Sequence, residues 1–91
     1  MTPAEAQALE DVHGYTLANR VEIQGHAWKR MRERGAKRED VRSALVTAKD
    51  CQAEPEVRGE ARWKVAGVDT AGDALDVVVE LVDGVIVVTL F

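Results

Sequence analysis

The sequence predicts an α+β domain in which N-terminal helices pack on a three- to four-stranded antiparallel sheet. Apolar residues recur at helical spacing in the first half of the chain, and the period changes to two after residue 56. Two β-branched runs, 74–82 and 85–91, are joined by Asp83-Gly84, a dipeptide typical of a tight hairpin turn. A length of 91 residues predicts one domain, 1–91.

Three helices are expected before the sheet. Thr2, Pro3 and Glu5 supply an N-cap, a first-turn proline and a capping-box acid, so the first helix covers about 3–12. The other two follow from apolar residues at i, i+3 and i+4 spacing and from a glycine stop at position 35, and they cover 25–34 and 38–49.

Short strand and loop segments complete the expected fold. Pro55 interrupts the segment after the third helix, which is therefore expected to be a loop. The remaining expected elements are a possible edge strand at 20–23, the loop at 50–56, a strand at 62–65 and a polar turn at 67–72.

A two-residue hairpin turn fixes which strand residues face each other. It pairs Val82 with Val85, Leu81 with Ile86, and Val78 with Thr89. One face is then wholly apolar and is expected to pack on the helices: Leu75, Val77, Val79, Leu81, Ile86, Val88 and Leu90. The other face is mixed: Asp76, Val78, Glu80, Val82, Val85, Val87, Thr89 and Phe91.

The strand at 62–65 extends this mixed face. Trp63 and Val65 belong on the buried side, so Arg62 and Lys64 are expected to share the open face with Glu80 and Thr89. Two cations, an acid and a hydroxyl on a partly apolar floor can bind a phosphodiester. They also fit an exposed sheet face with matched cross-strand charges.

A second group of polar residues follows one helix edge. His26, Arg30 and Arg34 are spaced i, i+4, i+8. Arginine binds phosphate bidentately, and a histidine with a pKa near neutrality can move the proton of a ribose hydroxyl. Alternatively, Arg34 caps the helix C-terminus and His26 forms a local hydrogen bond.

Charge is distributed unevenly along a chain of net charge −4. Residues 20–42 carry eight bases against four acids, whereas 1–19 and 43–91 are net acidic. The basic block suits an anion or nucleic-acid site, or a solvated helix face with mixed charges. Residues 1–19 either belong to the fold or form an added helix that covers the site.

Several other classes of protein are disfavoured. Cys51 is the single cysteine, so no intramolecular disulfide and no multi-cysteine zinc site is expected. Cys51 could form a catalytic pair only with His13 or His26. No segment has the ~20 apolar residues that span a membrane, and the N-terminus lacks the order of a signal peptide. We expect a cytoplasmic location. We also expect no bound metal or cofactor.

The motif order resembles a bacterial domain-of-unknown-function family that is grouped with the RelE-, HigB- and BrnT-like toxins of the barnase–EndoU–colicin–RelE nuclease fold. The resemblance covers roughly residues 20–91. It rests on four segments: HAWKRMRERGAKREDV (26–41), WKVAGVD (63–69), ALDVVV (74–79) and VVTLF (87–91).

The resemblance implies a RelE-like fold and a metal-independent endoribonuclease toxin that cleaves mRNA through its 2′-hydroxyl. Its implied partners are single-stranded or ribosome-bound mRNA and a cognate antitoxin protein. The implied catalytic residues are His26, Arg30, Arg34, Lys64 (or Arg62 on the same strand) and Thr89. The residues expected to bind RNA are Lys29, Arg62, Lys37 and Arg38.

A second interpretation is a non-catalytic interaction or regulatory module that kept this fold. The apolar hairpin strands and Phe91 are expected to leave an edge that pairs with a partner or with a second copy of the chain. No sequence feature favours a small-molecule sensor.

Overall fold

The computed structural model describes residues 1–91 and contains three helices and five strands. The elements in chain order are α1 (Pro3–Leu17), β1 (Val21–Ile23), α2 (Gly25–Arg34), α3 (Arg38–Thr47), β2 (Asp50–Val57), β3 (Glu60–Val68), β4 (Ala74–Leu81) and β5 (Val85–Leu90). The strands form one sheet in the order β1-β5-β4-β3-β2. None of the helices has the length and apolar character needed to cross a membrane.

The predicted α+β class is correct, but the predicted sheet is wrong in two respects. The sheet has five strands, and it is mixed because β1 runs parallel to β5 while the other neighbours are antiparallel. The segment at 20–23 therefore does form a strand. It pairs Val21 with Val85 and Ile23 with Val87, so β5 is not an edge strand over that length.

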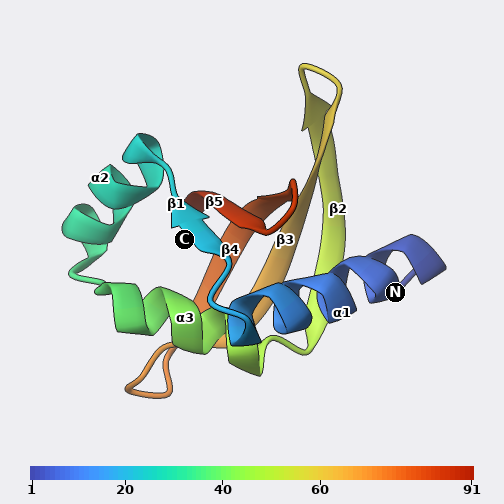
Figure 1. Ribbon diagram of the computed structural model, residues 1–91. Coiled ribbons are helices and arrows are strands. Elements are labelled where there is room, and N and C mark those ends of the chain that lie inside the picture. The colour runs from blue at the N-terminus through green and yellow to red at the C-terminus, as the bar shows by residue number, and fades with distance from the viewer.

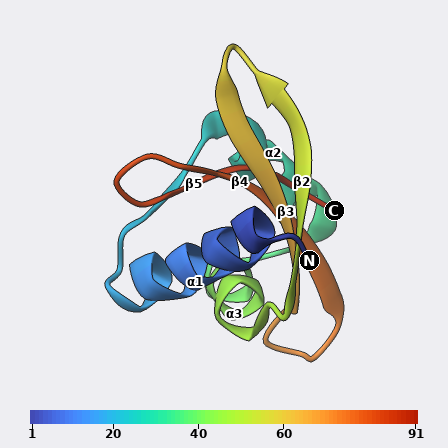
Figure 2. The same cartoon turned by 90° about the vertical axis from the view of Figure 1, so that its right-hand side faces the viewer.

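The helices cover one face of the sheet, which we call the inner face. In Figure 1, α1 and α3 cross in front of the strands, and in Figure 2 both lie on the same side of the sheet. No helix lies over β2, β3 and β4 on the opposite side, which we call the outer face. The third helix, α2, contacts β5 beside β1.

The core lies between the inner face and the helices. Its 18 buried residues are Ala8, Leu9, Val12, Ile23, Ala27, Met31, Val41, Ala44, Leu45, Ala48, Cys51, Val65, Leu75, Val77, Val79, Val85, Val87 and Leu90. Because α1 supplies three of them, residues 1–19 are part of the fold and do not cover the outer face.

Helix boundaries follow the expected signals closely. The Thr2–Glu5 capping box begins α1, and Gly35, at φ 69°, ends α2 as its C-cap. The first helix continues to Leu17, beyond the expected 12, and α3 ends at Thr47 rather than 49.

The close packing of α3 on β3 depends on Gly67. A Cβ on this residue would overlap the backbone of Ala44 in α3.

The expected loop at 50–56 is instead strand β2. It pairs with β3 from Asp50 to Val57, with a bulge between Glu54 and Val57. Pro55 is tolerated because it lies in this bulge of an edge strand, where no neighbouring strand needs its missing N–H. Beside the bulge, the Ala53 N–H donates to Glu5 of α1 at 2.8 Å.

The hairpin register differs from the prediction at the turn and agrees with it further along the strands. Leu81 pairs with Val85, so the loop has three residues rather than two, and the predicted pairs of Val85 and Ile86 are wrong. An extra residue, Val88, then bulges out of β5 and restores the predicted Val78–Thr89 pair.

This bulge changes which residues face the core. The structure buries Val85 and Val87 in the core, although the two-residue turn predicts them on the mixed face. Ile86, predicted to face the helices, pairs with Glu80 on the outer face.

Candidate nucleic-acid interface

The outer face is organised in cross-strand rows. One row runs across β2, β3, β4 and β5: Gln52, Lys64, Val78 and Thr89. The adjacent row contains Glu54, Arg62, Glu80 and Ile86. The register thus places Arg62, Lys64, Glu80 and Thr89 on one face, as predicted from alternation.

An ion pair occupies the centre of the second row. Arg62 Nε donates to Glu80 Oε2 at 2.9 Å, and the two side chains are only 25% and 12% exposed. Glu54 is the cross-strand neighbour of Arg62 on the other side. The Arg62 charge is therefore already balanced, which fits the matched-charge interpretation of this row better than phosphate binding.

The first row contains a cation without such a partner. Lys64 is half-buried, and neither of the two ion pairs of the structure includes it. Between Lys64 and Thr89 lies Val78, whose side chain is 5% exposed. Since neighbouring strands are about 4.8 Å apart, the Cα atoms of Lys64 and Thr89 are separated by roughly 10 Å.

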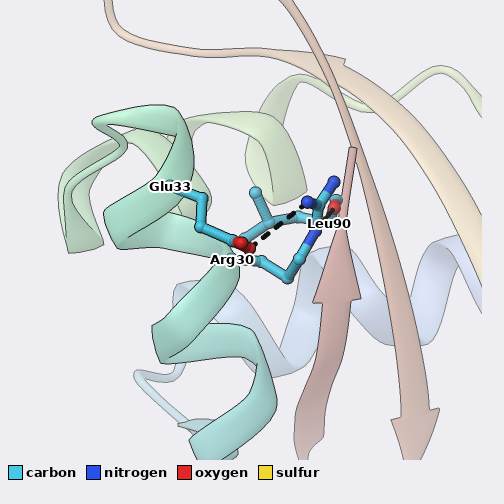
Figure 3. A network of polar contacts seen from close by, with 3 residues as sticks. All are labelled: Arg30, Glu33 and Leu90. Atoms are coloured by element: carbon cyan, nitrogen blue, oxygen red, sulfur yellow. Dashed lines mark hydrogen bonds and ion pairs between the residues drawn. The ribbon is translucent and has the colours of Figure 1, made fainter.

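Helix α2 brings an arginine to the end of this row. The Gln24 N–H donates to the Val87 carbonyl at 3.1 Å and Arg30 Nε donates to the Leu90 carbonyl at 3.3 Å, so α2 runs alongside the second half of β5. Since β1 ends at Ile23, the Leu90 carbonyl has no strand partner on this side, and Arg30 takes that place (Figure 3).

The orientation of Arg30 is fixed by a second contact. Its Nη1 lies 3.3 Å from Glu33 Oε1, one turn further along α2, while Leu90 holds Nε (Figure 3). Nη2 has no protein acceptor, so the guanidinium keeps free N–H groups near the Leu90 carbonyl, which follows Thr89 in β5.

The predicted site residues divide into two groups. His26 and Arg34 flank Arg30 by one turn on each side of α2, and both are exposed, as is Lys29. Lys37 and Arg38 belong to a different region: they lie at the start of α3, on the inner side of the sheet. Arg38 Nη2 donates to the Val21 carbonyl of β1 at 3.4 Å.

The structure buries one of the other candidate groups and gives the other a hydrogen-bond partner within the fold. Cys51 is fully buried, and burial raises the pKa of its thiol to about 11, with the nearby Glu5 and Asp50 acting in the same direction. His13 Nε2 donates to the Ala48 carbonyl at 2.8 Å. No three His, Cys, Asp or Glu side chains gather where they could hold a metal ion.

Sequence reasoning overlooked two residues of this interface. Glu33 fixes Arg30 and could have been found from its i+3 spacing. Val78 was placed opposite Thr89 on the mixed face but was given no role, and the structure shows that it separates Lys64 from Thr89.

The fold and the site define a small α+β domain with an uncovered sheet face that combines basic, acidic and hydroxyl side chains. The chain belongs to the family described as "Domain of unknown function (DUF4258)", whose model matches residues 23–91. The match runs from the end of β1 to the end of the chain, and α1 precedes it. No curated protein and no solved structure matches the chain significantly.

Proposed function

We propose that this protein is a toxin-like endoribonuclease that binds RNA at the β5–α2 end of the outer face. The observation that carries the proposal is the position of Arg30. Its side chain is held at Leu90, next to Thr89, and Thr89 shares a row with Lys64. Two cations and a hydroxyl thus lie along one row of the uncovered sheet face and at its β5 end, an arrangement that suits a phosphodiester backbone.

The proposed reaction is an internal transesterification. The ribose 2′-oxygen attacks the adjacent phosphorus, the bond from phosphorus to the 5′-oxygen breaks, and the products are a 2′,3′-cyclic phosphate and a 5′-hydroxyl. A base accepts the proton of the 2′-hydroxyl and an acid supplies one to the leaving oxygen. The nucleophile belongs to the substrate, so the protein contributes proton transfer and charge stabilisation.

Each residue has a proposed role in that reaction. His26 acts as the acid or the base, since imidazole exchanges protons near neutral pH. Arg30, Arg34 and Lys64 bind the phosphoryl oxygens and stabilise the charge that develops on them. Thr89 orients the substrate through its hydroxyl. Arg62, which is paired with Glu80, shapes the floor rather than binding phosphate.

The family resemblance supplies the proposed biological setting. Chains grouped with the RelE-, HigB- and BrnT-like toxins act on mRNA in the cytoplasm and are restrained by a cognate antitoxin. We extend the RelE-like fold, the mRNA substrate and the antitoxin partner to this protein as parts of the same proposal.

The test combines RNA cleavage with RNA binding. His26→Ala is expected to lower the cleavage rate about 10²- to 10⁴-fold while RNA affinity stays within a few-fold of wild type. Arg30→Ala is expected to lower the rate about 10²- to 10³-fold and to weaken binding as well. Arg58→Ala, in the exposed β2–β3 turn, is the matched control. Equal cleavage by all four proteins would remove the catalytic assignment.

A non-catalytic interaction module is the second candidate. The acidic residues of the outer face favour it: Glu54 and Glu80 flank Arg62, and Asp76 lies in the row on the other side of Lys64. Carboxylates repel phosphate and suit a protein partner with basic groups. This candidate predicts that induction of the wild-type protein causes neither growth arrest nor RNA cleavage.

A further inference from the structure

A cleft on the helix side of the molecule lies apart from the outer face. It has a volume of about 210 Å³ and is enclosed by the end of α1, by β1 and by the start of α3. Its apolar floor consists of Val21, Ile23 and Val41, of which Val41 is fully buried. Since α1 and α3 cover the inner face, a ligand in this cleft would not compete for the outer face.

The rim of the cleft carries two guanidinium groups. Arg38 and Arg42 are four residues apart and so lie on the same side of α3, on successive turns. Neither forms an ion pair: the only pairs in the structure are Arg30–Glu33 and Arg62–Glu80. Arg38 makes a single 3.4 Å contact with a carbonyl, and Arg42 makes no side-chain hydrogen bond. Both keep donors for an anion above an apolar floor.

We propose that this cleft binds a small amphipathic monocarboxylate. The carboxylate would accept hydrogen bonds from Arg38 and Arg42, whose planar forks match its geometry. A branched or aromatic group would cover Val21, Ile23 and Val41. The volume lies below the ~300–1,000 Å³ of sites for drug-sized ligands, which limits the ligand to about the size of benzoate.

The Glu39 carboxylate determines which ligand charge the cleft favours. The Glu39 side chain also lines the cleft and pairs with neither arginine. The net charge of the three rim groups is therefore +1. A monoanion balances this charge, whereas a dianion such as a phosphate monoester would leave an excess negative charge beside the Glu39 carboxylate. Asn19 adds a neutral amide at the same rim.

The test is a titration of the full chain with benzoate, followed by the backbone amide resonances at constant ionic strength. We expect saturable shifts centred on the amides of Val21, Ile23 and Glu39, with an affinity near millimolar. Benzamide, which has the same shape and no charge, is expected to bind at least about tenfold more weakly, because it lacks the carboxylate that pairs with the two guanidinium groups.

Variants separate this site from general attraction to a basic surface. Arg42→Gln and Arg38→Gln are each expected to weaken benzoate binding about tenfold. Arg32→Gln, which removes an equal charge from the exposed face of α2, is the matched control and should bind as wild type does. Glu39→Gln should tighten binding because it removes the repulsion.

Any one of the following results would overturn the proposal. They are an absence of saturable shifts, equal affinity for benzoate and benzamide, and equal weakening by Arg32→Gln and Arg42→Gln. Weaker binding in Glu39→Gln would also contradict it, since that outcome would mean that the cleft prefers a ligand with a positive group. The spectrum of each variant reports directly whether it is folded.

Discussion

Replacing Gly67 with alanine tests how α3 is held against the sheet. The new Cβ would lie 2.7 Å from the carbonyl carbon of Ala44 and 2.9 Å from its Cα, with the carbonyl oxygen closer still. Carbon atoms prefer a separation of about 3.5–4.0 Å, so the backbone of α3 must retreat by about 1 Å.

The expected loss of stability is large because the obstacle is backbone. A flexible side chain could rotate away, but Ala44 lies in the middle of α3 and its neighbour Leu45 is fully buried. Overpacking of a core costs typically about 1–3 kcal/mol, and we expect the upper end, about 2–3 kcal/mol. For a domain of this length, that loss lowers the melting temperature by roughly 10–20 °C.

The assay is urea denaturation at neutral pH, followed by the fluorescence of Trp28 and Trp63. Gly14→Ala is the matched control because it makes the same chemical change within α1, where an added Cβ meets nothing within 4 Å. It should raise stability by about 0.5–1 kcal/mol, since alanine restricts the unfolded chain and favours a helix. A Gly67→Ala protein with the wild-type midpoint would refute the reasoning.

Three further predictions concern charged and nucleophilic groups. The Glu5 carboxylate accepts hydrogen bonds from the N–H groups of Thr2 and Ala53, which hold its pKa below the ordinary 4.5. Its contribution to the stability of the fold is therefore present above about pH 4.5 and is lost as the pH falls through the lower pKa of the folded state. The melting temperatures of wild type and Glu5→Gln should accordingly differ at pH 7, and the difference should shrink progressively as the pH falls below 4.5; a constant difference would contradict this. Cys51 should react with a thiol reagent in native protein far more slowly than in urea, because it is buried with a raised pKa, and fast native labelling would reopen its candidacy as a nucleophile. If three cations each neutralise one RNA phosphate, a plot of the logarithm of RNA affinity against the logarithm of salt concentration should have a slope of about −2. The Lys64→Ala substitution should make that slope shallower by about 0.7, and an unchanged slope would exclude Lys64 from the interface.

Local signals predicted the helices well because each signal acts within a few residues. The Thr2 cap and the left-handed Gly35 fix the ends of α1 and α2 through backbone groups that lie close in sequence. Strand β2 was missed for the opposite reason. Its residues lack β-branched alternation, and β3 supplies the hydrogen bonds that hold it extended, which is a tertiary effect.

The Val78–Thr89 pair of the outer face was predicted correctly only because two deviations from the predicted hairpin cancel each other. The hairpin loop is one residue longer than expected, and the bulge at Val88 shifts β5 back by one residue. Thr89 therefore still pairs with Val78, while Ile86 does not have its predicted partner. A run of consecutive valines and isoleucine contains no polar residue to mark a register, so alternation alone could not locate the bulge.

The position of Arg30 lay beyond any pattern in the sequence. Its contact with Leu90 joins residues 60 positions apart and depends on β1 ending at Ile23. Spacing alone placed His26, Arg30 and Arg34 on one helix edge but could not say which strand that edge meets. For the same reason, Lys37 and Arg38 were grouped with residues from which the fold separates them.

The edges of the sheet have a consequence for assembly. At one edge, Glu5 occupies the Ala53 amide and Pro55 has no N–H to offer; at the other, Arg38 and Arg30 occupy the carbonyls of Val21 and Leu90. A strand from another molecule would first have to displace these side chains. Extension of the backbone ladder at either edge would therefore cost existing contacts, whereas docking on the outer face of the sheet would leave them in place.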